Sequence, residues 1–283
     1  GVGQWKDGWE SLEEAVQISS GLGDRRQWGQ SSAILAVAAL YHGEFSRSEK
    51  LYGDLYRAAA RTGDIQQQLW GLDGQAVNLI RLGKTGEALA LLQKAEPFLT
   101  AVGDRLQVIN HNGMVGMAHL QQGNFELARQ SADSVASLLA HASPTICTEF
   151  DGYAGLAEVY LGLMEAEEKS QIPNSKSQAR QACKALSQFA RVFPMAQPRA
   201  QLLEGLYHWL DRKPEGAFRE WRASLAAAER MAMPYEAGRA HYEIGRHLPA
   251  GDPNRKLHLT RAREIFAELG AGYDLSLVSG QEG

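Results

Sequence analysis

Histidines, serines and glycine-rich segments are the residues of this chain whose types could carry out chemistry. His241 and His247 are six residues apart, so on one helix they would point in different directions and could not share a metal ion, which requires a spacing of four. The glycine pairs in residues 1–3 and 21–23 lack the rest of a dinucleotide-binding fingerprint, and no nucleophile elbow frames a serine. The sequence therefore predicts no enzyme and no catalytic, metal-binding or cofactor-binding residue. The alternative is an active site assembled from residues far apart in the chain.

The cysteine content and the charge restrict the classes of partner. Cys147 and Cys183 are too few for a disulfide framework, and we interpret them as reduced core residues of a cytoplasmic protein. The formal net charge of −4 indicates neither nucleic acid nor an anionic membrane surface as a partner. No apolar run reaches the roughly 18 residues that span a bilayer. A composition rich in Ala, Leu, Glu, Arg and Gln predicts an all-helical fold.

The elements that would position any site are marked by a glycine repeat. Gly-Asp pairs recur every forty residues, at Gly23-Asp24, Gly63-Asp64 and Gly103-Asp104, and Gly43, Gly83 and Gly123 keep the same step between them. A glycine just past a helix adopts the left-handed conformation that ends the helix, and an Asp after it caps the next one. This pattern predicts an array of helical hairpins.

Three columns of residues recur at the same positions of the predicted repeats, which span residues 23–62, 63–102, 103–142, 143–194, 195–233 and 234–272. Small residues in the first helix and again in the second helix predict close helix–helix packing, and mostly large residues four positions later would fill the space between hairpins. The columns are Ala36, Ala76, Gly116, Ala157, Gly205 and Gly245; Ser48, Ala88, Ala128, Ala179, Ala217 and Ala262; and Tyr52, Leu92, Ala132, Cys183, Trp221 and Phe266.

These residues resemble the tetratricopeptide repeat, and the segments Gly83–Ala88 and Gly123–Ala128 are the clearest copies of its Gly-to-Ala step. The resemblance implies an all-α, right-handed solenoid of antiparallel helix hairpins. The family's usual repeat is about 34 residues, and the lengthened repeat of this chain resembles the helical arms of bacterial signalling ATPases and of multidomain adenylate/guanylate cyclases. HEAT and armadillo repeats have a similar length, but they do not call for the Gly-to-Ala step.

The ends of the chain and one insertion depart from this pattern. Residues 1–22 are predicted to be the second helix of a truncated preceding repeat, which suggests a fragment of a larger protein. The exposed apolar face of this helix is expected to pair with a second copy to form a dimer. Residues 165–177 are polar and rich in Pro, Asn and Ser, so they are predicted to be an inserted loop, or an extended helix end followed by a loop. Residues 273–283 are predicted to be a disordered tail.

In tetratricopeptide arrays the first helix of each pair lines the concave face, and the resemblance therefore implies a set of partner-binding residues. Aromatic residues, Met and Arg are typical anchors of interfaces, and the charge of the set changes from acidic to basic along the array. The set comprises Tyr41, Trp70, Asp73, Arg81, Asn110, Met117, Gln121, Asp151, Glu158, Arg199, Arg239, Tyr242 and Arg246. It does not match the carboxylate clamp that the family uses for chaperone tails.

Two functions follow from this interpretation. The first is a non-enzymatic protein-interaction scaffold or sensor arm of a larger cytoplasmic signalling protein, which binds a protein or peptide segment, or a neighbouring domain of its parent chain. The second is a regulatory arm that senses a small molecule for a cyclase, an ATPase or a transcriptional regulator. A deep apolar pocket would favour the second function, and an open groove would favour the first.

Overall fold

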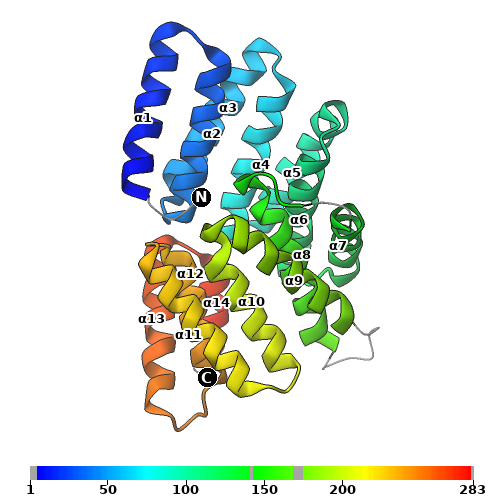
Figure 1. Ribbon diagram of the computed structural model, residues 1–283, viewed down its shortest axis with the longest axis vertical. Helices are drawn as coiled ribbons and strands as arrows, with labels where there is room; N and C mark the ends of the chain where they lie inside the picture. The colour runs from blue at the N-terminus through cyan, green and yellow to red at the C-terminus, as the bar shows by residue number, and fades with distance from the viewer. Residues whose placement is uncertain (1–4, 141–142, 168–174, 282–283) are drawn as a thin grey trace.

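The computed structural model describes residues 5–140, 143–167 and 175–281, and within these residues every regular element is helical (Figure 1). The α-helices are α1 (Trp5–Leu22), α2 (Arg25–Tyr41), α3 (Phe45–Thr62), α4 (Ile65–Arg81), α5 (Thr85–Val102), α6 (Arg105–Gln121), α7 (Phe125–Leu139), α8 (Phe150–Glu167), α9 (Lys176–Val192), α10 (Gln197–Leu210), α11 (Pro214–Arg230), α12 (Pro234–His247), α13 (Pro253–Leu269) and α14 (Gly272–Ser279). Short 3₁₀ turns, η1 (Cys147–Glu149) and η2 (Pro194–Ala196), precede α8 and α10.

The Gly-Asp pairs separate consecutive hairpins, as the sequence predicted. Gly63 has a φ of 74° and ends α3. Asp64 follows it, and its Oδ1 accepts a hydrogen bond of 3.0 Å from the backbone N–H of Gln67 in the first turn of α4. The same combination of a left-handed glycine and a capping aspartate recurs at Gly23-Asp24 and Gly103-Asp104. The three pairs therefore fix where α2, α4 and α6 begin.

The repeated small residues lie where the helices of a hairpin cross. The second-helix column is fully buried from Ser48 to Ala262, and the third column is buried throughout. Ser48 adds a polar tie, because its hydroxyl donates to the carbonyl of Ala36 on α2 at 2.8 Å. At Gly205 a Cβ atom would lie 2.5 Å from the ring of Trp221, so a larger residue would displace the indole. The prediction of close packing at these columns is confirmed.

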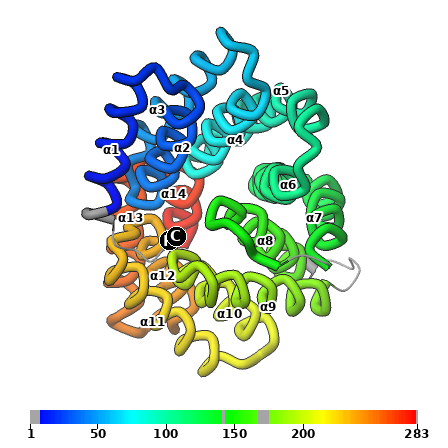
Figure 2. The backbone as a smooth tube through the Cα atoms, turned by 45° about the horizontal axis from the view of Figure 1, so that its top comes forward, coloured from blue at the N-terminus to red at the C-terminus, as the bar shows by residue number. Residues whose placement is uncertain are grey.

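Consecutive hairpins pack in series, and the even-numbered helices from α2 to α12 contact one another along the inside of the array (Figure 2). The approach of α6 to α8 is especially close because glycines face each other there. A Cβ on Gly113 would lie 2.6 Å from the Cα of Gly152, and a Cβ on Gly155 would lie 2.5 Å from the carbonyl oxygen of Gly113. The two backbones are therefore in contact, which brings the inner sides of these helices together.

The array curves until its two ends touch, so that α12–α14 lie beside α2–α4 (Figures 1 and 2). The rings of Phe45 on α3 and Tyr235 on α12 are 5.9 Å apart. A Cβ on Gly43 would lie 2.7 Å from the ring of Pro234 and 2.9 Å from Leu269. The molecule is therefore a closed ring of helices and not an open arc.

The segment predicted as a disordered tail is different in the structure, because residues 272–279 form α14. Val278 and Ala271 are fully buried, and the hydroxyl of Tyr235 donates to Asp274 at 3.0 Å. A Cβ on Gly83, at the end of α4, would lie 2.7 Å from the backbone nitrogen of Tyr273. The prediction failed because α14 is stabilised by contacts with both ends of the array, which local sequence does not reveal.

The other two departures are only partly described. Of the predicted inserted loop, 165–177, the first three residues belong to α8 and the last two to α9, while 168–174 lie outside the described residues. At the other end, α1 packs on α2 and leaves Ile18 and Leu22 exposed by 53% and 79%. Pairing of this helix with a second copy stays a prediction.

Candidate functional site

Most of the residues that the sequence nominated for binding lie on the inner side of the ring, here called the inner face. It is formed by α2, α4, α6, α8, α10 and α12. Two of the nominated residues, Tyr41 and Arg81, contact the carboxylate of a third, Asp151. Asp151 accepts from the hydroxyl of Tyr41 at 2.9 Å and from Nη2 of Arg81 at 3.1 Å. All three side chains are buried. They hold α2 and α4 against α8.

A second group of buried charges surrounds Arg199, whose side chain is fully buried. Its Nε and Nη2 donate to the two carboxylate oxygens of Glu236 at 2.7 and 2.6 Å, and its Nη1 donates to Glu158. Arg239 donates to the same oxygen of Glu158 at 2.7 Å. A bidentate arginine–carboxylate pair of this kind is both strong and geometrically specific. These contacts join α8, α10 and α12.

The carboxyl groups of this cluster respond differently to their neighbours. Burial raises the pKa of Glu158, but the guanidinium groups of Arg239 and Arg199 outweigh burial and lower that pKa to about 2. For Asp151 and Asp274 burial wins, and the pKa of each lies above its usual value despite the nearby arginines. Desolvation disfavours a charge and an opposite charge restores it, so the balance differs from one carboxyl to the next.

The remaining nominated residues also contact the protein itself. Asp73 is buried and its Oδ1 lies 2.9 Å from Nδ1 of His111, and the side-chain oxygen of Asn110 accepts from the backbone N–H of Gly152 at 3.0 Å. Arg246 donates to Glu165 and Glu243 and lies over the ring of Tyr242. Met117 is buried in the core, while Trp70 and Gln121 are half-buried. Asp73, Asn110 and Arg246 are therefore engaged in internal contacts, whereas the buried side-chain oxygen of Gln121 has no hydrogen-bond partner among the described residues.

Sequence reasoning nominated Asp151 and Glu158 but missed the other acidic partners of these arginines, Glu236, Glu243 and Glu165, although one signal was present. Glu236, Arg239, Glu243 and Arg246 follow one another at intervals of three or four residues, which places alternating charges on one face of α12. Such a stripe indicates a face that pairs with other charges. Tyr235 and Asp274 had no comparable signal, because their contact depends on the position of α14.

His241 and His247, which are spaced too far apart to share a metal ion, contact different partners. The ring of His247 stacks on Trp221 with 4.7 Å between ring centroids. Nδ1 of His241 lies 2.8 Å from Nδ1 of His258 on α13. Burial and the neighbouring His258 lower the pKa of His241 to about 4. Within the described part of the chain, His, Cys, Asp and Glu side chains form no group of three or more with a geometry suited to a metal ion.

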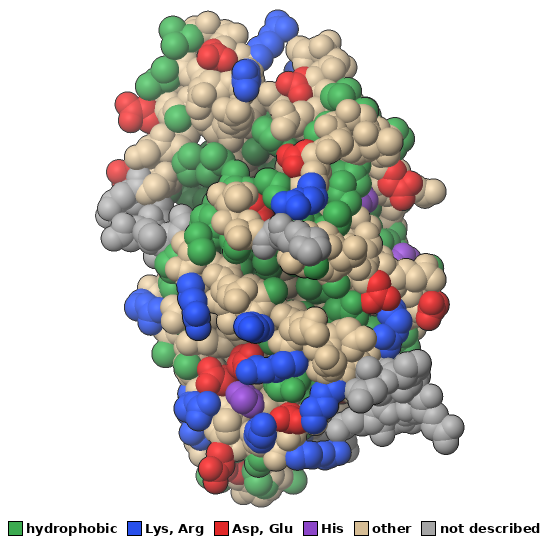
Figure 3. Space-filling view, turned by 45° about the vertical axis from the view of Figure 1, so that its right-hand side comes forward, with side chains coloured by type: hydrophobic (Ala, Val, Ile, Leu, Met, Phe, Trp, Pro, Cys, Tyr) green, Lys and Arg blue, Asp and Glu red, His purple; other side chains and the backbone are tan. Residues whose placement is uncertain are grey.

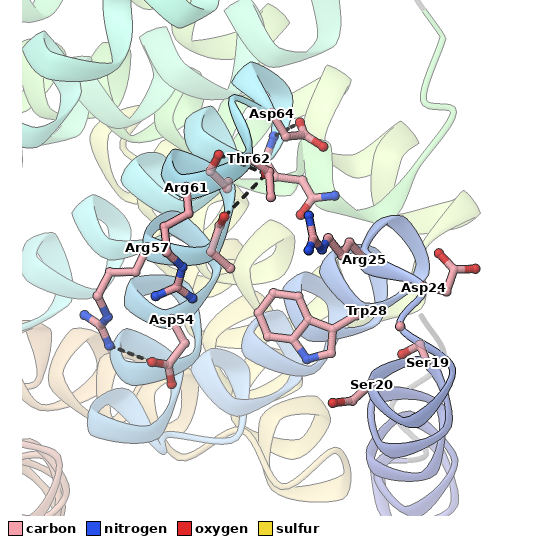
Figure 4. A pocket seen from close by; sticks show the side chains of 14 residues that line it. Ser19, Ser20, Asp24, Arg25, Trp28, Asp54, Arg57, Arg61, Thr62 and Asp64 are labelled. Atoms are coloured by element: carbon pink, nitrogen blue, oxygen red, sulfur yellow. Dashed lines mark hydrogen bonds and ion pairs between the residues drawn. The ribbon is translucent and has the colours of Figure 1, made fainter.

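The surface of the molecule is hollowed between the ends of the first two hairpins, in a space here called the hairpin cleft (Figure 4). It has a volume of about 650 Å³ and lies between the last turns of α1 and α3 and the first turns of α2 and α4. Trp28 lies at its centre and is half-buried, whereas Arg25, Arg57 and Arg61 are exposed around it. None of these four residues was nominated from the sequence. The repeat pattern indicates where helices end, but it does not indicate which side chains surround the space between those ends.

The local structure explains how the cleft stays open. Gln67, on α4, fits against Gly29 on α2, where a Cβ atom would lie 2.0 Å from its side-chain oxygen. This contact fixes the floor of the cleft. At the rim, Gly23 and Gly63 end α1 and α3 in the left-handed conformation and have no atom within 4 Å of the place of a Cβ. The mouth therefore faces solvent.

The remaining surface and the comparisons add little to these two places. On the face seen in Figure 3, side chains of Lys and Arg are interspersed with those of Asp and Glu. No described helix has the length and apolar character needed to cross a bilayer.

A scan of the chain against known protein families finds no match, and a search of curated proteins finds none either.

Proposed function

We propose that this chain is a non-enzymatic interaction module of the tetratricopeptide type, which binds a protein segment in the hairpin cleft and not on its inner face. The observation that supports this location is a contrast in accessibility. Arg199, at the centre of the inner face, has no exposed surface, whereas Arg25 and Arg61 stand exposed beside a half-buried tryptophan. A ligand reaches the cleft without breaking any contact of the ring.

The residue types of the cleft also support binding. Tryptophan and arginine are the residues that most often dominate the binding energy of protein interfaces, especially where the aromatic ring is set in a partly desolvated pocket. Trp28 packs at its edge against the buried cluster of Ala36, Tyr52 and Leu55, so its ring is already fixed before a partner arrives. A fixed side chain loses less conformational entropy on binding.

A small molecule is the second candidate, and the volume of the cleft is the observation that favours it. Pockets for small ligands usually enclose about 300–1,000 Å³, and the hairpin cleft falls within that range. Its mouth, however, is wide and lined by exposed side chains, whereas small-ligand pockets bury most of the ligand surface. The open form favours a segment that runs across the cleft.

The test is a selection of binders from a random peptide library on the immobilised chain and on two variants. Thr62→Trp places a bulky ring at the mouth of the cleft, and Thr100→Trp makes the same change at the end of α5. The two threonines are matched because each is exposed and donates its hydroxyl to a backbone carbonyl one turn earlier. We expect peptides that bind the parent and Thr100→Trp but not Thr62→Trp. Peptides that bind all three equally would contradict the proposal.

A further inference from the structure

The charged residues of the hairpin cleft are not equally free to meet a ligand. Asp24 and Asp64 each accept a hydrogen bond from a backbone N–H in the first turn of the following helix, and Asp54 accepts from Arg57 at 2.6 Å. Each of the three carboxylates in the cleft thus already has one partner within the protein. A negative charge at a helix start is also balanced by the positive end of the helix dipole.

The cations are in a different position. Arg25 and Arg61 form no ion pair with any residue in the part of the chain that the structure describes. Figure 4 shows their side chains near the indole of Trp28, at the mouth of the cleft. The cleft therefore offers a ligand two guanidinium groups without an ion-pair partner, and guanidinium groups bind carboxylates in a planar, often bidentate geometry.

We infer that the hairpin cleft binds an acidic peptide segment, with carboxylates on Arg25 and Arg61 and an apolar or aromatic side chain on the ring of Trp28. This inference rests on the proposed function and adds the chemical class of the partner. The half-buried indole offers a flat apolar surface between the two cations. An aromatic side chain packs well on such a surface, and the guanidinium groups then fix the direction of the chain beside it.

Nucleic acid is another negatively charged partner that could contact the two arginines, but the cleft fits it poorly. Asp24, Asp54 and Asp64 line the same space as the arginines, and a continuous phosphate backbone would pass close to all three. The chain as a whole has a formal net charge of −4. A peptide can place its carboxylates at the two arginines alone, so it avoids this repulsion.

To test this inference, the peptides that bind the parent and Thr100→Trp but not Thr62→Trp are sequenced. Their affinity for charge-reversed variants is then measured. We expect the selected pool to be enriched in Asp and Glu together with an aromatic or large apolar residue. Synthetic peptides from the pool should bind the double variant Arg25→Glu/Arg61→Glu about tenfold or more weakly than the parent. Their affinity for the parent should also fall as salt is raised.

The control variant is Arg26→Glu/Lys50→Glu, which makes the same change of charge on α2 and α3 at exposed residues that do not line the cleft. It should leave the affinity within about twofold, because neither side chain lines the cleft and both are exposed to solvent. A cleft-dependent pool without acidic enrichment, or an equal loss with the control variant, overturns the inference while the proposed function stands. A library that yields no cleft-dependent peptide overturns both.

Discussion

Arg81 and Asp151 form an ion pair across the inner face, although seventy residues separate them in the sequence. The distance between Nη2 and Oδ1 is 3.1 Å, and the side chains are exposed by only 3% and 8%. A linear array of hairpins would leave such residues in an open groove. Here the curvature of the array brings them together, and the groove is filled by the protein's own charges.

The first prediction concerns the centre of this charge cluster. Replacing Arg199 by Met should lower the free energy of unfolding by about 3–5 kcal/mol, because the buried carboxylates of Glu236 and Glu158 would lose a partner that they cannot replace with water. Urea-induced unfolding measures the effect. Arg219→Met removes an exposed pair with Glu220 and should change stability by less than about 0.5 kcal/mol. Equal effects of the two changes would show that the cluster contributes nothing.

The second prediction concerns acid. The folded pKa of Glu158, about 2, lies below its ordinary value of 4.5, so its ionised form stabilises the fold above pH 4.5. This contribution is lost as the pH falls from 4.5 to about 2, and its size is on the order of 3 kcal/mol. Glu158→Gln should therefore be less stable than the parent at neutral pH, and the difference should shrink over that interval. A difference independent of pH would refute the assignment.

The third prediction also concerns pH, but the stability contributed by the carboxyl group of Asp274 falls as the pH rises. Burial raises the pKa of Asp274 above 3.8, so the folded state binds a proton more tightly than the unfolded state does. Stability from this group is present below pH 3.8 and is lost as the pH rises through the raised value. Asp274→Asn should consequently gain stability relative to the parent as the pH rises above 3.8, measured by thermal unfolding in a series of buffers. A relative loss over the same range would contradict the sign.

The fourth prediction concerns the close approach of α6 and α8. Gly113→Ala would place a Cβ against the backbone of α8, 2.6 Å from the Cα of Gly152, and should cost about 1–3 kcal/mol through overpacking. Gly86→Ala is the matched control, because it is also helical but has no atom within 4 Å of its Cβ position. That change should be neutral or stabilising by about 0.5–1 kcal/mol. Denaturant unfolding of both variants decides whether contact or mere helix propensity matters at Gly113.

The fifth prediction concerns α14. Val278→Ala should lower the free energy of unfolding by about 1.5–3 kcal/mol, because it leaves a cavity under a fully buried side chain. It should also speed hydrogen exchange at the end of α4, where Gly83 contacts α14. Ser279→Ala, at an exposed position of the same helix, serves as the control for both measurements. Unchanged exchange in α4 would mean that α14 does not hold the two ends together.

The parts of the fold that could be predicted from the sequence are those set by local rules. The left-handed glycine at Gly63 and the cap at Asp64 follow from backbone sterics and from the unsatisfied N–H groups of a helix start. The buried column that includes Ser48 and Ala262 follows from the spacing at which two helices meet. Each of these depends on residues within one hairpin.

The closed inner face could not be predicted in the same way. Arg199 meets Glu158 and Glu236, which lie 41 and 37 residues away, and whether they meet depends on a small rotation repeated at every hairpin. The sequence gives no direct measure of that rotation. The hairpin cleft is likewise a space between helix ends, and its lining changes with the angle at which neighbouring hairpins pack.

The contact between the two ends of the array, at Phe45 and Tyr235, has a consequence for how the chain folds and varies. In an open array each repeat contacts only its neighbours, so repeats unfold in part and can be gained or lost one at a time. Closure couples the first hairpins to the last across about two thirds of the chain, from Phe45 to Tyr235, and a contact of this range is entropically costly to form and slow to find. The ring should therefore unfold as one cooperative unit, in contrast to the partial unfolding of an open array.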